Sequence, residues 1–322
     1  MYTQSLFEQI LINPASEGAD ELLIITGYAS SAMAYHHIQA LADKKLNVKI
    51  NIIIGMCPED GISLSNHRGF RFLVEKEYPD IFSCSYIYKP PPVHIKLYAW
   101  LKNTVPIKGF IGSANYSQKA FSTNQREAMD DCSATSIVSE YNKISPDSIY
   151  CNHIESDSFV RIYGTEHQDF QTSTISSDKI DLSNDIKMSD LEKIEVSLLT
   201  AKGDIVGEIS GLNWGQRSKR DPNQAYIPLN APQNTSGFFP QIGKHFTVLT
   251  DDGFSLICTR EQDFGKAITT PQKNSHIGEY FRMRLSLANG SKVSKRHLDS
   301  YGRTSVTFYK LDDETYYMDF SV

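Results

Sequence analysis

The chain has 322 residues, of which 40% are hydrophobic, 22% charged and 11% aromatic. This composition excludes a disordered, collagenous or coiled-coil protein, and the length corresponds to about two domains. The net charge is −6, but it is unevenly spread: residues 1–170 hold 14 Lys and Arg against 19 Asp and Glu, whereas residues 191–310 hold 16 against 11. An acidic first part and a locally basic second part indicate two modules with different tasks.

The sequence shows no pattern for export, membrane insertion or metal binding. Residues 1–8 lack a positively charged start followed by an apolar run. The longest hydrophobic stretch, 22–34, is too short and too polar to cross a bilayer. The five cysteines form no close pair, which favours free thiols over disulfides or a zinc site. We therefore expect a cytoplasmic protein without membrane contact and without a metal cofactor.

Strand and helix patterns alternate in the first part of the chain. Short apolar runs predict strands, and amphipathic runs after polar N-caps predict helices. The predicted strands are 21–26, 48–55, 83–88, 94–101 and 108–113, and the predicted helices are 31–42 and 69–77. We expect the last two strands to be joined by a turn that contains Pro106 and Gly109. This order predicts an α/β domain, residues 1–170, with a sheet flanked by helices.

The pattern of predicted elements changes after residues 171–190. This segment is rich in Ser, Thr and Asp, and we interpret it as a linker. Residues 191–322 contain short strand patterns with one helical candidate, 294–301. The predicted strands are 245–250, 254–259, 280–287, 306–311 and 315–320, the first two joined by the turn Asp251-Asp252-Gly253. Many short strands and one short helix predict an all-β barrel or sandwich.

Chemistry-bearing side chains gather between residues 94 and 115. His94 and Lys96 are two residues apart in a predicted strand, so their side chains point the same way. Ser113 and Asn115 share a face at the end of the next strand, where we expect Gly112 to let backbone approach a ligand. An imidazole, an ammonium, a hydroxyl and an amide can converge on a tetrahedral anion, which is what phosphoryl transfer requires.

The segments His94-Ile-Lys96 and Gly112-Ser113-Ala114-Asn115 resemble the signature of the phospholipase D superfamily. The resemblance implies that His94 is the nucleophile or general acid of a metal-independent phosphodiesterase that passes through a phosphohistidine. It also implies that Lys96 and Asn115 hold the phosphate with support from Ser113, and that Glu127 orients the histidine. The superfamily usually has Asp five residues after the lysine; here that residue is Leu101, a departure that points away from the lipases.

The superfamily needs two such motifs in each active site, and this chain contains one His-x-Lys. We therefore expect the second half of the site to come from another copy of the chain. This predicts a homodimer whose shared site lies on the two-fold axis, with one histidine attacking and the other protonating the leaving oxygen.

Two polar loops in the second part of the chain carry side chains suited to DNA. Arg pairs with guanine, Asn and Gln pair with adenine, and Lys and Arg neutralise phosphates. The candidates in the first loop are Asn213, Trp214, Gln216, Arg217, Ser218, Lys219, Arg220, Asp221 and Asn223. Those in the second are Gln262, Asp263, Lys266, Gln272, Lys273 and Asn274.

The barrel pattern with these loops resembles the DNA-binding pseudobarrel shared by the plant B-three domain and the recognition domains of the restriction enzymes BfiI and EcoRII. The loops 211–224 and 260–275 correspond to its N-arm and C-arm, which clamp the major groove. A phospholipase D-type domain followed by a pseudobarrel resembles the R subunits of NgoFVII/NgoAVII-type restriction endonucleases. That resemblance implies a sequence-specific endonuclease subunit that works with a separate helicase-like ATPase and a DNA methyltransferase, and ATP would then act only through the partner.

Two alternatives stay open at this point. A DNA-binding regulator with an inactive phospholipase D-like domain would explain Leu101, whereas the intact His94, Lys96, Asn115 and Glu127 argue against it. A lipid phosphodiesterase would need a membrane-facing surface or two motifs in one chain, and the sequence shows neither.

Overall fold

The computed structural model describes residues 1–123, 125–164, 188–200, 203–271 and 273–322. The chain divides into two compact units, Met1–Tyr163 and Gly164–Val322, here called the N-terminal and C-terminal units. Most of the predicted linker, residues 171–187, lies outside the described residues.

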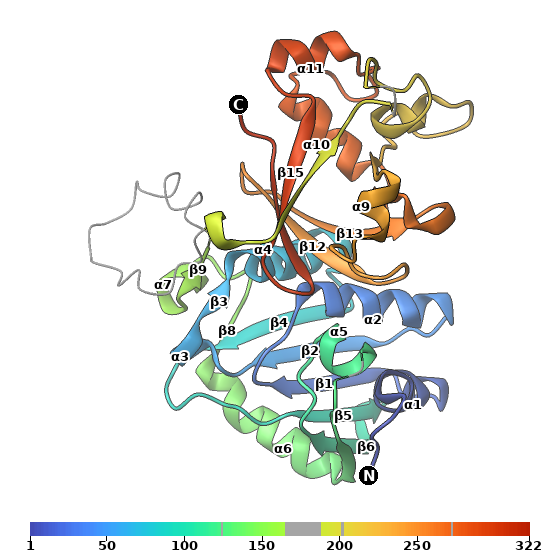
Figure 1. Ribbon diagram of the computed structural model, residues 1–322. Helices are drawn as coiled ribbons and strands as arrows, with labels where there is room; N and C mark the ends of the chain where they lie inside the picture. Colours follow the sequence, from blue (N-terminus) through green and yellow to red (C-terminus); the bar gives the residue numbers. More distant parts are fainter. Residues whose placement is uncertain (124, 165–187, 201–202, 272) are drawn as a thin grey trace. The chain divides into compact units, whose positions relative to one another are not determined.

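A seven-stranded mixed sheet forms the centre of the N-terminal unit (Figure 1). Its strands in spatial order are β7 (Met129–Cys132), β6 (Val105–Gly112), β5 (Leu97–Lys102), β1 (Glu21–Thr26), β2 (Lys49–Ile54), β4 (Phe82–Ile87) and β8 (Ser148–Tyr150). The three central strands β1, β2 and β4 are parallel, and the flanking strands are antiparallel to their neighbours. The apolar runs that predict β1, β2 and β4 are buried on both faces, as expected for parallel strands under helices.

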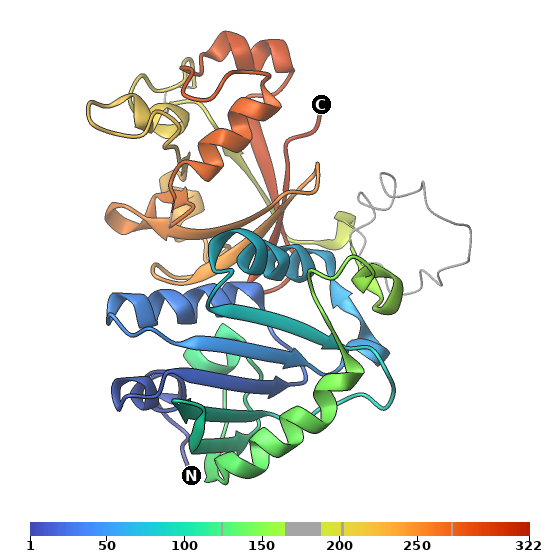
Figure 2. The same cartoon turned by 180° about the vertical axis from the view of Figure 1, so that it is seen from behind.

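Helices cover both faces of this sheet. The face that carries Leu23, Ile25 and Ala99 packs against α6 (Ala134–Ile144), which Figure 2 shows crossing the sheet. The opposite face of β5 packs against η1 (Phe7–Ile12) and α5 (Gln118–Ser122), where Trp100 Nε1 donates to Ile10 O at 2.8 Å. The other elements of the unit are α1 (Asn13–Ser16), α2 (Ser31–Asp43), α3 (Cys57–Asp60), β3 (Ile62–Ser63), α4 (Leu64–Phe72), η2 (Leu73–Glu77), η3 (Ser145–Asp147), α7 (Ser156–Phe159) and β9 (Ile162–Tyr163).

The α/β prediction is confirmed, with differences in detail. The first predicted helix is capped by Ser30, whose hydroxyl accepts from Met33 N at 3.1 Å. The helix predicted at 69–77 begins five residues earlier, at Leu64, because Ser63 caps it.

The hairpin between β5 and β6 turns at Asn103 and Thr104, so the turn predicted around Pro106 and Gly109 is wrong. Both turn residues have positive φ, 48° and 67°, as a two-residue hairpin requires. The Asp20 carboxylate accepts from Asn103 N at 2.9 Å and stabilises this conformation. Gly109 lies inside β6, where a Cβ would come within 2.8 Å of Ala134 N, so it lets α6 approach the sheet.

The C-terminal unit is built on a second seven-stranded sheet. Its strands in spatial order are β10 (Lys193–Ser197), β15 (Ser305–Lys310), β16 (Thr315–Asp319), β12 (His245–Thr250), β13 (Ser255–Glu261), β14 (Ala267–Thr269) and β11 (Ile227–Pro228). β12 and β16 are parallel and all other pairs are antiparallel. The end strands β10 and β11 lie close to each other around a common apolar core, which gives the near-barrel shape that the sequence predicts.

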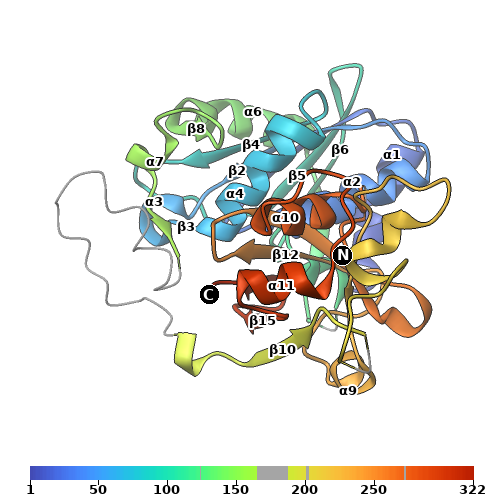
Figure 3. The same cartoon turned by 90° about the horizontal axis from the view of Figure 1, so that it is seen from above.

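This unit contains more helix than the sequence predicts. The segment 280–287, predicted as a strand, belongs largely to α10 (His276–Arg284), because Ile277, Tyr280 and Phe281 are buried at helical spacing. The predicted helix at 294–301 is α11 (Lys295–Tyr301). The rings of Phe281 and Tyr301 pack on Phe320. Figure 3 shows α10 and α11 lying next to each other. The remaining elements are η4 (Met188–Asp190), η5 (Gly211–Gln216), α9 (Ala231–Thr235) and η6 (Asp263–Gly265).

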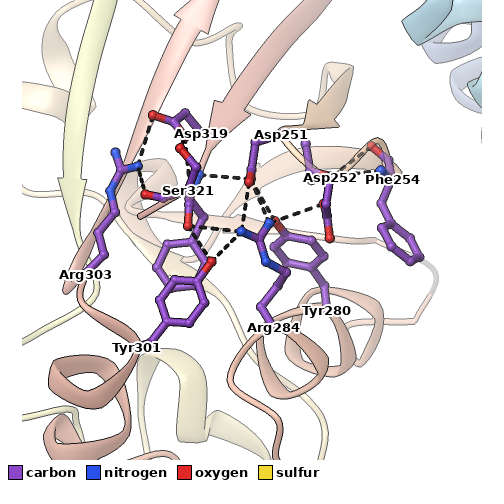
Figure 4. Close-up of polar contacts among 11 residues, drawn as sticks. Asp251, Asp252, Phe254, Tyr280, Arg284, Tyr301, Arg303, Asp319 and Ser321 are labelled. Atoms are coloured by element: carbon purple, nitrogen blue, oxygen red, sulfur yellow. Dashed lines mark hydrogen bonds and ion pairs between the residues drawn. The ribbon is translucent and has the colours of Figure 1, made fainter. Parts of the chain in front are cut away.

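A polar network fastens α10 to the sheet (Figure 4). Arg284 donates from both terminal nitrogens to the Asp251 carboxylate, at 2.8 Å each, and lies 3.3 Å from Asp252. It also donates to the carbonyl of Phe320 at 3.1 Å, which accepts from Tyr301 Oη at 2.7 Å. The predicted turn 251–253 is therefore confirmed, and its two aspartates hold α10 and the C-terminal segment together.

Candidate active site and DNA-binding loops

His94 and Lys96 precede strand β5 rather than lying inside it, because the pairing with β1 begins at Leu97. The two side chains nevertheless meet. Lys96 Nζ lies 3.1 Å from His94 Nε2 and donates to the carbonyl oxygen of His94 at 2.8 Å. Lys96 is only 7% exposed, and this burial lowers the pKa of its ammonium, with the carboxylate of Glu127 acting in the opposite direction. The His94 side chain is exposed.

Asn115 is oriented by the end of β1 and by the loop that follows it. Its Oδ1 lies 3.3 Å from Thr26 Oγ1 and accepts from Tyr28 N at 3.2 Å. Among the described residues, no hydrogen bond uses its Nδ2. With the amide oxygen occupied, the side chain presents its NH₂ group as a donor for an incoming ligand. The sequence predicted this side chain but not the two residues that orient it.

Ser113 and Glu127 are neighbours. Ser113 Oγ donates to Glu127 Oε2 and accepts from Ala128 N at 3.1 Å. The other oxygen of Glu127 accepts from Gln125 Nε2. Among the described residues, no hydrogen bond joins Glu127 to His94, so the carboxylate contacts the serine and not the imidazole that it was expected to orient.

The glycine expected to admit a ligand has a different role. At Gly112 a Cβ would come within 2.1 Å of Ala128 O, so this glycine allows β7 to pair closely with β6. The glycine beside the histidine is Gly27, where a Cβ would lie 2.8 Å from His94 Cδ2. The sequence carried no local signal for this contact, because Gly27 and His94 come together only through the pairing of β1 with β5.

Tyr28 forms one wall of the site. Its ring lies edge-on to the His94 imidazole, with centroids 5.8 Å apart and an interplanar angle of 77°. Its hydroxyl donates to Asp60 Oδ2 at 2.5 Å, and this hydrogen bond, followed by burial, raises the pKa of Tyr28 to about 12. The phenol is therefore a hydrogen-bond donor at neutral pH and holds the ring against the imidazole.

The N-arm (211–224) contains buried and exposed candidates. Asn213 is fully buried, and its amide bonds to the carbonyls of Gly207 and Val293 and to the amide of Val293, so it presents no group to a base. Trp214 is half-buried under Arg220, whose guanidinium lies 4.0 Å from the indole centroid. The side chains of Gln216 and Asn223 bond to neighbouring backbone. The candidates that face solvent are Arg217, Ser218, Lys219, Arg220 and Asp221.

The C-arm (260–275) exposes fewer of the predicted residues. Asp263 and Lys266 are exposed and form a 3.8 Å ion pair, and Lys273 is exposed as well. Gln262 and Asn274 are half-buried. Gln272 lies outside the described residues.

A buried arginine supports each arm. Arg282 has no exposed surface and donates to the carbonyls of Leu212, Pro222, Asn223, Gly278 and Ser291, at 2.8–3.5 Å. Arg260 is 8% exposed and donates to the carbonyls of Asn234, Pro240 and Gly265, at 2.8–3.2 Å. Sequence reasoning missed both roles, because an arginine in a strand or helix carries no local mark of burial.

Comparison with known proteins agrees with a catalytic N-terminal unit and a DNA-binding C-terminal unit. A family model described as the NgoFVII restriction endonuclease N-terminal PLD domain matches residues 4–158, where PLD stands for phospholipase D. A second, described as the NgoFVII C-terminal B3-like DNA-binding domain, matches residues 186–312. The chain belongs to the NgoFVII restriction endonuclease family. As a member of the NgoFVII family it is a restriction endonuclease with a PLD-type nuclease domain and a B3-like DNA-binding domain, and DNA is its partner.

Two solved structures match part of the chain. NucT from Helicobacter pylori matches with a TM-score of 0.32 and 18% identity, covering 44% of this chain and 87% of that one. Polyphosphate kinase from Porphyromonas gingivalis matches with a TM-score of 0.29 and 11% identity, covering 47% of this NgoFVII-family chain and 23% of that one. Curated proteins include no significant match.

Two features are absent from the described residues. No helix there has the length and apolar character needed to span a bilayer. In the same part of the chain, no three His, Cys, Asp or Glu side chains are grouped so as to hold a metal ion.

Proposed function

We propose that this restriction endonuclease cuts DNA without a metal ion, through a covalent phosphohistidine on His94, in a site shared by two copies of the chain. The observation that carries the proposal is the arrangement around His94 Nε2. The imidazole is exposed, the buried ammonium of Lys96 lies 3.1 Å from Nε2, and Asn115 presents a free NH₂ group from an anchored amide. A nucleophile flanked by preorganised donors is what attack on a phosphodiester needs.

In the proposed reaction, a phosphate oxygen takes over the hydrogen bond from Lys96, which releases the Nε2 lone pair. His94 Nε2 attacks phosphorus, the bond to the leaving sugar oxygen breaks, and the partner subunit's His94 protonates that oxygen. A water molecule then attacks phosphorus, gives its proton to the partner subunit's His94, and breaks the phosphorus–nitrogen bond. Lys96 and Asn115 donate to the non-bridging oxygens in both steps.

The proposed pairing of two chains rests on the count of motifs. The sequence has one His-x-Lys, and the proposed reaction uses two histidines with different tasks. One site per dimer also means that the two DNA strands are cut in separate events.

We further propose that the exposed arm residues make the contacts with DNA, with Arg217, Lys219 and Arg220 in the N-arm and Lys266 and Lys273 in the C-arm. Their charges suit phosphates and guanine edges. The family resemblance is the basis for proposing a separate ATPase subunit and a methyltransferase that protects host DNA.

Cleavage of supercoiled plasmid by the purified full-length chain tests the chemistry. We expect nicking to persist in EDTA after metal removal, to disappear in His94→Ala, and to survive in the control His153→Ala, which removes an exposed histidine of the same unit. Denaturation during turnover should trap a DNA end that is joined covalently to His94 through its phosphate. Cleavage lost in EDTA, or full activity in His94→Ala, would contradict the proposal.

The same assay with and without the ATPase subunit separates two outcomes. Cleavage that appears only with the subunit would show partner dependence. DNA binding with no cleavage and no phosphohistidine under either condition would favour a DNA-binding protein with an inactive nuclease domain.

A further inference from the structure

The C-arm presents an aromatic ring that the fold does not use. Phe264 lies in η6, between β13 and β14, and its side chain is 85% exposed. Its φ is +62°, and the neighbouring Gln262 and Gly265 have φ values of +63° and +68°. A bulky side chain rarely adopts this left-handed conformation, which strains the backbone unless the surroundings impose it. The strain is not offset by burial, since the ring faces solvent.

The surroundings do impose this conformation. Asn234 Nδ2 donates to the carbonyl of Phe264 at 2.7 Å, and Gly265 N donates to the carbonyl of Gln262 at 2.8 Å. Arg260 holds the next carbonyl, that of Gly265, at 3.2 Å. Gly265 itself is tightly packed, because a Cβ there would come within 2.7 Å of Ile242 Cγ1. The backbone on both sides of Phe264 is therefore anchored, and the ring is a fixed projection rather than the end of a loose loop.

The position of this projection indicates what it contacts. Phe264 lies within the segment matched by the B3-like DNA-binding domain and next to the charged pair Asp263 and Lys266. At 85% exposure, neither face of the ring is covered by the protein to any great extent. Apolar rings of this kind can insert between base steps and unstack them, a contact that needs both faces of the ring. An anchored backbone reduces the ordering cost of that insertion.

We propose that Phe264 is an aromatic wedge that inserts between neighbouring base pairs of the bound DNA. The wedge depends on DNA binding by the C-terminal unit and not on the phosphohistidine chemistry. The arms read some bases directly, and the wedge in addition deforms the duplex. The ease with which one base step unstacks therefore contributes to the preference for a DNA sequence.

Binding measurements on the full-length His94→Ala chain test the wedge without cleavage. A duplex enriched from a random pool supplies the probe, and 2-aminopurine is placed in turn at each adenine position of that duplex. We expect the 2-aminopurine fluorescence to rise on binding at one base step. Phe264→Asn should abolish that rise and weaken binding at least tenfold. The slope of log affinity against log salt should not change, because the ring neutralises no phosphate.

Two variants separate recognition from folding. Asn tolerates left-handed backbone, so Phe264→Asn should unfold at the same temperature as the parent or higher. The control Phe254→Asn removes a ring that is 48% exposed in the β12–β13 turn of the same unit, and it should leave affinity unchanged.

Three results would overturn the wedge. The first is equal affinity in Phe264→Asn, and the second is weaker binding without a fluorescence rise at any position in the parent. The third is a lower unfolding temperature in Phe264→Asn that accounts for the weaker binding. Failure to enrich any duplex would instead overturn sequence-specific binding itself and the wedge with it.

Discussion

Replacement of Arg282 by lysine should destabilise the C-terminal unit and disorder the N-arm. The guanidinium donates to five carbonyl oxygens and has no exposed surface, whereas a lysine ammonium has three donors and can serve three of them at most. At least two buried hydrogen bonds are lost, each worth about 1.5 kcal/mol when the donor is charged. We therefore expect Arg282→Lys to lower the free energy of unfolding by about 3 kcal/mol and the unfolding temperature by about 10 °C.

The two tryptophans provide a separate reporter for each unit, because Trp100 lies in β5 and Trp214 lies in the N-arm. In protein labelled with 5-fluorotryptophan, urea titration followed by ¹⁹F NMR should show an earlier transition for Trp214 and an unchanged one for Trp100. The matched control is Arg217→Lys, since Arg217 is exposed and bonds to a single carbonyl, that of Ile209 at 2.8 Å. A loss below 1 kcal/mol in Arg282→Lys would refute the argument that the carbonyls depend on this side chain.

Three other predictions concern the N-terminal unit. Asn115→Asp replaces a hydrogen-bond donor by a carboxylate oxygen beside the phosphate. The plasmid nicking rate should therefore fall about 100-fold or more, with DNA affinity unchanged. A nicking rate within tenfold of the parent would count against the role assigned to Asn115. Burial lowers the pKa of His37 to about 4, and because the unfolded chain binds the proton first, about 3 kcal/mol of unfolding free energy should be lost as pH falls from 6.5 to 4. Urea titrations should show His37→Gln to be less pH-dependent over that range, and identical slopes would disprove the assignment. Since Asp60 raises the pKa of Tyr28 to about 12, Tyr28 stabilises the fold below pH 10 and ceases to do so as pH approaches 12; the unfolding midpoint of Tyr28→Phe should fall less over that interval than that of the parent.

Local pattern was sufficient for the α/β unit and for the hairpin at 251–253. These features depend on neighbours in sequence: apolar runs that make buried strands, and a turn residue with positive φ. The strand prediction for 280–287 was wrong because Tyr280, Arg282 and Arg284 alternate with apolar residues as in a strand. In the structure, Ile277, Tyr280 and Phe281 form the buried face of a helix.

The residues that surround the candidate site could not be predicted from local sequence pattern. Gly27 and Tyr28 contact His94 only after β1 and β5 have paired, and nothing near residue 27 marks it as part of a site. The burial of Asn213 and of Arg282 depends on how α10 packs against the N-arm. Asn213 was therefore predicted as a DNA contact, and the supporting role of Arg282 was not predicted.

On the side of the His94 imidazole that faces residue 27 there is room for a hydrogen atom but not for a side chain, because a Cβ at that position would lie 2.8 Å from His94 Cδ2. An alanine at that position would leave every charge and donor in place and still tilt the ring out of line. Under the proposed pairing of chains, a cell that made both versions would assemble mixed dimers. In such a dimer the misaligned imidazole of one subunit would inactivate the site that it shares with a normal subunit. A single methyl group in one gene copy would then act as a dominant inhibitor of the enzyme.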